Sequence, residues 1–165
     1  MLNIPNSLTI GRIIGSISLP ILVLFTTKET GCFLALIIFI CCAITDFLDG
    51  HIARRLNQES SLGKMLDPIA DKLLVILVLS FLVLIYSGTY DYLLGIPSVL
   101  IISREILVSG IREYFGSCRE KFSVMKLSKF KTGMQMIAII CLLASQLDPF
   151  AGVYFFQLGL ICLWL

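Results

Sequence analysis

The sequence predicts an all-α, polytopic membrane protein with six transmembrane helices. The 165 residues are 58% hydrophobic and only 15% charged, whereas soluble domains are close to half apolar with about 25% charged residues. The mean hydropathy is +0.96. Several apolar runs approach the length of about 20 residues that a helix needs to cross a bilayer. They lack the alternation that is typical of a membrane β-barrel.

Each apolar run is interpreted as a helix, because a backbone in lipid must satisfy its hydrogen bonds internally. Some runs are short and reach spanning length only if the helix continues into charged flanks, as in Asp67–Ser87. The last run stops at Trp164-Leu165 without a polar cap, which is compatible with a truncated last helix in a single transmembrane domain over residues 1–165. In chain order the runs are Leu8–Phe25, Gly31–Thr45, Lys72–Ser87, Tyr92–Ser109, Gly133–Leu147 and Phe150–Leu165.

Most positive charges lie in alternate connections between these helices. The connections on the other side hold a single cation, Lys28. By the positive-inside rule, both basic segments and the N-terminus are expected to face the cytoplasm, in a bacterial-type inner membrane. A basic face suits anionic headgroups and phosphorylated substrates. Nucleic acid is not expected as a partner of a basic face in a membrane protein. The basic segments carry Arg54, Arg55 and Lys64, and then Arg112, Arg119, Lys121, Lys126, Lys129 and Lys131.

Two pairs of aspartates flank the first basic segment. Asp46 and Asp49 are three residues apart near the end of the second predicted helix, and Asp67 and Asp71 are four apart at the start of the third. Both spacings place the paired side chains on one helix face. If the two faces meet, four carboxylates share one pocket at the cytoplasmic boundary.

The negative charge of such a cluster must be neutralised, because each ionised carboxylate costs ~3 kcal/mol at the centre of a membrane helix and less near the interface. Protonation of some carboxylates or binding of cations would neutralise it. Ligands that are all oxygen suit Mg²⁺ or Mn²⁺, so the cluster indicates a divalent metal site and phosphate chemistry. In the alternative interpretation, Asp67 before Pro68 is an ordinary helix N-cap. That alternative covers Asp67 and Asp71 but leaves Asp46 and Asp49 unexplained.

The residues around these acids carry a resemblance. The pattern Asp46-x-x-Asp49-Gly50-x-x-Ala53-Arg54, followed after eight residues by Gly63-x-x-x-Asp67-x-x-x-Asp71, resembles the signature of the CDP-alcohol phosphotransferase family. The resemblance implies the six-helix catalytic fold of that family over the whole chain. It also implies two divalent ions: Asp46, Asp49 and Asp67 would ligate one, and Asp49, Asp67 and Asp71 the other. Asp71 would also be the general base.

The same resemblance implies a site for a CDP-linked donor. Gly50, Ala53 and Arg54 would hold the cytidine and its pyrophosphate, with Ser60 a further contact. The segment Pro5-Asn6-Ser7-Leu8-Thr9 resembles the PNxLT segment of the family, and Arg12 follows one turn later. Asn6, Thr9 and Arg12 would therefore line the cytidine pocket. Without the resemblance, Asn6 or Ser7 would be interpreted as a helix cap and Arg12 as an interfacial anchor.

Two later segments resemble the phosphatidylglycerophosphate synthases within that family. They are Ser103–Glu113 and Lys129-Phe130-Lys131-Thr132-x-x-Gln135-Met136, although Ser128 replaces a glycine that is common in the second segment. This resemblance implies that CDP-diacylglycerol and glycerol 3-phosphate are the substrates, and that phosphatidylglycerol phosphate and CMP are the products. The predicted residues for the acceptor phosphate are Arg104, Arg112, Lys129 and Lys131. In the alternative interpretation, these are solvated positive-inside charges and Arg104 forms a structural pair with Glu105.

Other functions stay open at this point. Within the family, a cardiolipin, phosphatidylinositol or phosphatidylserine synthase would use a different acceptor. An ion or proton carrier could use membrane carboxylates, but a transport route also needs polar groups in the far half of the helices. A structural membrane subunit would not need the acids. The expected partners are CDP-diacylglycerol, glycerol 3-phosphate, membrane lipids and, by family resemblance, a second copy of the chain.

Overall fold

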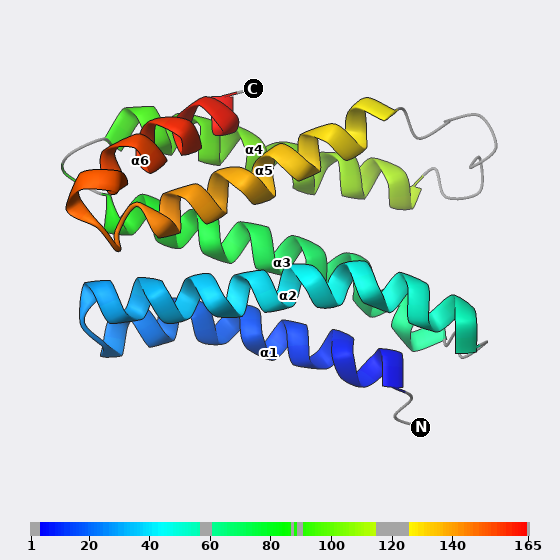
Figure 1. Ribbon diagram of the computed structural model, residues 1–165. Helices are drawn as coiled ribbons and strands as arrows, with labels where there is room; N and C mark the ends of the chain where they lie inside the picture. Colours follow the sequence, from blue (N-terminus) through cyan, green and yellow to red (C-terminus); the bar gives the residue numbers. More distant parts are fainter. Residues whose placement is uncertain (1–3, 57–60, 87, 89–90, 115–125, 165) are drawn as a thin grey trace.

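The protein is a bundle of long helices (Figure 1). The computed structural model describes the backbone of residues 4–56, 61–86, 88, 91–114 and 126–164, and the regular structure in these ranges is α-helical. This confirms the predicted all-α fold. The helices are α1 (Ile4–Phe25), α2 (Lys28–Leu56), α3 (Ser61–Ile85), α4 (Asp91–Tyr114), α5 (Lys126–Ala144) and α6 (Pro149–Trp164).

The helices around the acidic pattern are longer than the apolar runs. α2 continues past Asp46 and Asp49 to Leu56, and α3 begins at Ser61, well before Asp67. The N-cap interpretation of Asp67 is therefore wrong, whereas Asp46 and Asp49 lie near the end of α2, as predicted, with further helical residues after them. The physical reason is that an apolar run ends where side chains leave the hydrocarbon, whereas backbone hydrogen bonds of a helix continue into water.

The protein is an integral membrane protein. Four segments are long and apolar enough to cross a bilayer, namely Asn6–Phe25, Lys28–Asp46, Met65–Ile85 and Tyr92–Ile111. The apolar stretches of α5 and α6 are shorter, at Lys131–Ala144 and Phe150–Trp164. Large apolar side chains are exposed on the outside, as α4 shows with Val99, Leu100 and Leu107. Lipid contact would cover such a surface.

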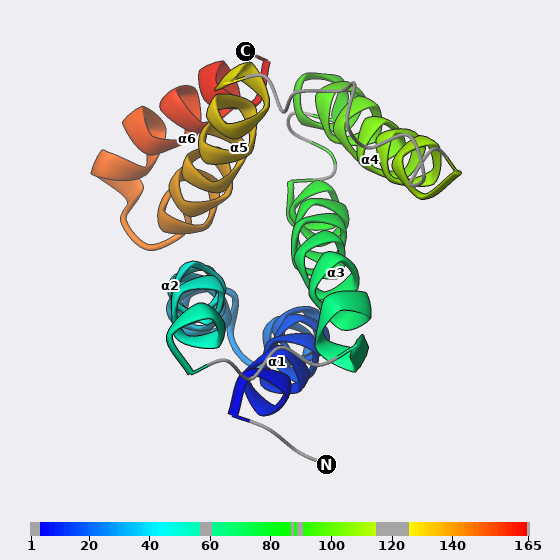
Figure 2. The same cartoon turned by 90° about the vertical axis from the view of Figure 1, so that its right-hand side faces the viewer.

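Seen end-on (Figure 2), α1, α2 and α3 lie together, α5 and α6 form a pair, and α4 lies beside α3. α1 packs mainly against α2 and α3, α5 packs against α6 and α2, and α4 lies against α3 and α6. Their shared core contains fully buried apolar side chains such as Phe39, Leu79 and Leu142. The starts of α1, α3 and α5 and the ends of α2 and α4 lie at one end of the bundle, on the right in Figure 1. That end therefore carries the acidic pattern and the helix ends that flank both basic segments.

Gly152 marks a close backbone approach between α6 and the turn that follows α5. A Cβ atom on this residue would lie 2.3 Å from the carbonyl oxygen of Ser145, a backbone atom that cannot rotate away. We expect Gly152→Ala to lower the free energy of unfolding by about 1–3 kcal/mol, the usual cost of overpacking. The midpoint of thermal unfolding in detergent measures this change.

The matched control is Gly95→Ala in α4, where an added Cβ would meet nothing within 4 Å. This variant should be neutral or slightly more stable, since alanine is the better helix former. If the two variants unfold at the same temperature, the backbone contact at Gly152 is not tight in solution.

Candidate active site

The acidic pattern converges on one buried arginine. Arg12 of α1 is 2% exposed as a residue. Its Nη1 atom donates hydrogen bonds to Oδ1 of Asp46 and, at 2.7 Å, to Oδ1 of Asp71. The side chains of Asp46 and Asp71 are 40% and 49% exposed. Asp46 of α2 and Asp71 of α3 thus share the guanidinium of Arg12 from α1, and part of each carboxylate side chain stays accessible.

A second contact from α1 reaches the third acid. Thr9 donates a hydrogen bond of 2.7 Å from Oγ1 to Oδ1 of Asp67. Thr9 and Arg12 are one helical turn apart, so they share a face. Asn6 lies a further turn back on the same face and is also buried. α1 therefore presents a buried polar stripe of Asn6, Thr9 and Arg12 toward the acids.

This stripe overturns the simpler interpretations of the α1 residues. Asn6 lies inside a helix that begins at Ile4, so it does not cap that helix. Arg12 is enclosed by protein, so it is not an interfacial anchor. The sequence pattern pointed to both residues, but only the folded chain shows that Arg12 binds the acids.

Other predicted residues near the acids are placed only in part. Asp49, Gly50, Ala53 and Arg54 belong to the last turns of α2, but their side chains lie outside the described set, and Ser60 lies outside the described residues altogether. Among the side chains that the structure describes, no group of three or more His, Cys, Asp or Glu could hold a metal ion. The convergence of all four aspartates therefore stays a prediction.

The described donors nevertheless fit a cation. Oxygen atoms of Asp46 and Asp71 approach the same nitrogen of the guanidinium, so this place between α1, α2 and α3 already binds positive charge. Carboxylate oxygens are the ligands that Mg²⁺ and Mn²⁺ prefer. The donor set is thus chemically suited to a hard divalent ion.

A hydrogen bond links this centre to α4. Lys72, the neighbour of Asp71 in α3, donates to the hydroxyl of Ser109. The contact joins two helices that also pack along their lengths. It fixes the helix that carries Asp67 and Asp71 against the helix that carries Arg104.

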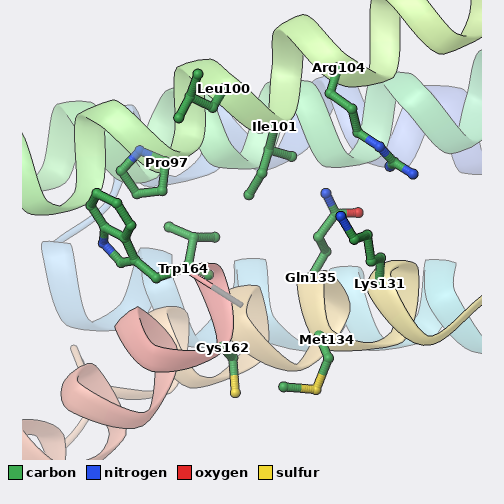
Figure 3. Close-up of a pocket in the computed structure, with 10 residues that line it drawn as sticks. Pro97, Leu100, Ile101, Arg104, Lys131, Met134, Gln135, Cys162 and Trp164 are labelled. Atoms are coloured by element: carbon green, nitrogen blue, oxygen red, sulfur yellow. The ribbon is translucent and has the colours of Figure 1, made fainter. Parts of the chain in front are cut away.

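A cavity of about 250 Å³ lies between α4, α5 and α6. Figure 3 shows the side chains of Arg104, Lys131 and Gln135 gathered at one end of it. Its remaining walls are mostly apolar and include Pro97, Leu100, Ile101 and Trp164. The structure thus brings together two of the four cations that were predicted for the acceptor phosphate, from two different helices.

The remaining residues of the acceptor prediction are placed as follows. Arg104 forms an ion pair with Glu105, as one of the sequence interpretations expected. Arg112 lies near the end of α4 and Lys129 near the start of α5, but neither side chain belongs to the described set. Gln135 was not among the predicted site residues. Two signals were available: Gln135 belongs to the segment that resembles the phosphatidylglycerophosphate synthases, and it lies one turn after Lys131 on the same face of α5.

The chain is similar to a known family of membrane enzymes over nearly all of its length. Residues 2–165 match the family model described as CDP-alcohol phosphatidyltransferase. Three relatives named CDP-diacylglycerol–glycerol-3-phosphate 3-phosphatidyltransferase are similar throughout. The protein from Rickettsia bellii is 42% identical over 99% of this chain and 86% of its own length. The protein from Cereibacter sphaeroides is 41% identical over 92% of this chain and 68% of its own length. The Arabidopsis thaliana protein, which carries the number 2 in its name, is 39% identical over 98% of this chain and 72% of its own length.

Proposed function

The chain belongs to the CDP-alcohol phosphatidyltransferase family, and from this membership we propose that it transfers the phosphatidyl group of CDP-diacylglycerol to glycerol 3-phosphate. The products are phosphatidylglycerol phosphate and CMP. The observation that carries the proposal is the similarity, at about 40% identity across the chain, to relatives that are named for this reaction. The acids that meet at Arg12 and the cationic end of the cavity supply groups that the chemistry needs.

In this proposal, Asp71 is the general base. It takes the proton from the attacking hydroxyl of the acceptor, which is the ordinary task of a carboxylate placed beside a nucleophile. The hydroxyl oxygen then forms a bond to the phosphorus that carries the diacylglycerol. The bond between that phosphorus and the oxygen shared with CMP breaks, and CMP leaves with the electron pair. The open side of Asp71 leaves room for an acceptor.

Asp46, Asp49, Asp67 and Asp71 would hold Mg²⁺ or Mn²⁺, with two ions expected. When bound, such ions supply charge neutralisation for the pyrophosphate and for the in-line displacement. Donor binding falls to residues of α1, of α2 and of the connection to α3. Arg54 suits a phosphate because a guanidinium can bind it in bidentate fashion. The proposed donor residues are Asn6, Thr9, Arg12, Gly50, Ala53, Arg54 and Ser60.

The acceptor phosphate would bind to Arg104, Arg112, Lys129 and Lys131. Support comes from the meeting of Arg104 and Lys131 at one end of the cavity. The active site would face the cytoplasm of a bacterial-type inner membrane, because the end of the bundle with the acids also carries the helix ends that flank the basic segments. Membrane lipids surround the protein, and a homodimer is the proposed assembly.

A panel of acceptors tests the proposal. Purified protein receives CDP-diacylglycerol with Mg²⁺ or Mn²⁺, and CMP release is measured with glycerol 3-phosphate, inositol, serine or phosphatidylglycerol. Release is expected with glycerol 3-phosphate and not with the other three. Release with one of the others instead would assign the chain to a different branch of the family. Release with none of the four would remove the transferase assignment and reopen the ion-carrier hypothesis.

A further inference from the structure

Gln135 is a buried amide that points into the cavity between α4, α5 and α6. It is 7% exposed, and its side chain lies beside those of Arg104 and Lys131 (Figure 3). The amide group borders the cavity and is therefore open to a molecule bound there. The polar end of the cavity thus holds two cations, of which Arg104 is paired with Glu105, and one amide.

An amide that lines a mostly apolar cavity is placed to hydrogen-bond a ligand there, and a ligand that leaves it without a partner loses that interaction. An amide has a carbonyl oxygen that accepts and an NH₂ group that donates, so it complements a hydroxyl, which does both. Arg104 and Lys131 only donate and carry positive charge, so they complement a phosphate.

The size of the cavity indicates a small ligand. About 250 Å³ falls below the ~300–1,000 Å³ that is usual for pockets of drug-sized ligands. A ligand with a phosphate and a hydroxyl on neighbouring carbons would use all three polar side chains at this end. Glycerol 3-phosphate has that arrangement at its C3 and C2 atoms.

We propose that Gln135 is a specificity-determining residue of the acceptor pocket and that its amide hydrogen-bonds the C2 hydroxyl of glycerol 3-phosphate. The inference deepens the proposed function and rests on it. Arg104 and Lys131 bind the phosphate on C3, and Gln135 binds the hydroxyl on C2. The C1 hydroxyl then stays free to attack the donor. An acceptor that lacks the C2 hydroxyl leaves the amide without this hydrogen bond. A site that hydrogen-bonds a substrate hydroxyl discriminates in this way against an analogue that lacks the hydroxyl.

The test compares two acceptors that differ only at C2, namely glycerol 3-phosphate and 3-hydroxypropyl phosphate. For the unaltered protein, kcat/KM should favour glycerol 3-phosphate by about 10- to 100-fold, the usual range for one unmade hydrogen bond at a buried group. For Gln135→Met, kcat/KM for glycerol 3-phosphate should fall by about the same factor, while the value for 3-hydroxypropyl phosphate stays the same or rises. The preference should therefore shrink to near unity.

The matched control is Gln157→Met, which makes the same exchange at an exposed position of α6. This variant should keep the full preference. Thermal unfolding separates a ligand-binding role from a structural one. Because the amide borders the cavity, Gln135→Met should leave the melting temperature unchanged or raise it, whereas a glutamine that holds two helices together would lose stability on the same exchange.

Three results would overturn the inference. If the unaltered protein uses glycerol 3-phosphate and Gln135→Met keeps the preference, Gln135 does not bind the C2 hydroxyl and the proposed function stands. If the variant instead raises KM for CDP-diacylglycerol alone, the cavity serves the donor. If the unaltered protein uses neither acceptor, the proposed function fails and the inference falls with it.

Discussion

Asp71→Asn is expected to lower the rate of CMP release by about 10³-fold. General base catalysis by a placed side chain contributes about 10²–10⁴-fold, and an asparagine amide cannot take the proton. The exchange keeps the size of the side chain, and the amide oxygen can still accept the hydrogen bond from Arg12. The fold should therefore persist, and the loss should appear in kcat under saturating substrates.

Asp148→Asn is the control for this exchange. Asp148 is exposed and accepts a hydrogen bond of 2.9 Å from the backbone N–H of Phe150 at the start of α6. Asparagine caps a helix as well as aspartate does. The rate of CMP release by Asp148→Asn should therefore stay within about twofold of the unaltered protein's. If Asp71→Asn keeps more than a tenth of the activity while Asp148→Asn is normal, Asp71 is not the base.

The number of helices could be predicted from the sequence, because each long apolar run must be helical in lipid. The ends of the helices could not. Beyond the hydrocarbon, side-chain polarity no longer constrains the backbone, so α2 extends to Leu56 and α3 starts at Ser61 without any break in composition at Asp49 or Asp67. The N-cap interpretation failed for this reason: an aspartate before a proline is a good local signal, but here the helix had already begun.

The pairing of the acids was predictable only within each helix. The spacings of Asp46 with Asp49 and of Asp67 with Asp71 fix a shared helix face. No spacing along the chain relates Arg12 to Asp46 and Asp71, which contact it from two other helices. That contact depends on how α1 packs against α2 and α3. The sequence marked Arg12 as important only through its family resemblance.

Gln135 shows a different limit of sequence analysis. Helical periodicity places it on the same face as Lys131, but it cannot distinguish a face that lines a cavity from one that lines the core. A buried glutamine in a membrane helix is equally compatible with a hydrogen bond to a neighbouring helix. Only the arrangement of α4, α5 and α6 around the cavity separates the two cases.

Arg12→Met is expected to destabilise the protein and to make its stability depend on divalent metal. Removing one partner of a fully buried ion pair typically costs about 3–5 kcal/mol, because the other charge is left uncompensated. Asp46 and Asp71 are only half-buried, so water screens them and the loss should be smaller, about 1–3 kcal/mol on the same scale. Methionine retains much of the volume of the arginine stem, so the loss should come mainly from charge. The midpoint of thermal unfolding in detergent without divalent ions measures it.

Added Mg²⁺ or Mn²⁺ should then raise the melting temperature of Arg12→Met by more than that of the unaltered protein. The guanidinium contacts oxygens of Asp46 and Asp71, which are predicted metal ligands, so arginine and a divalent ion repel each other and compete for the same atoms. Without Arg12 the ion binds more tightly, and a tighter ligand of the folded state stabilises it more at a given concentration. KCl at matched ionic strength controls for screening. If divalent ions raise both melting temperatures equally, Arg12 does not compete for the metal ligands. If they raise neither, the acids that meet at Arg12 do not bind metal.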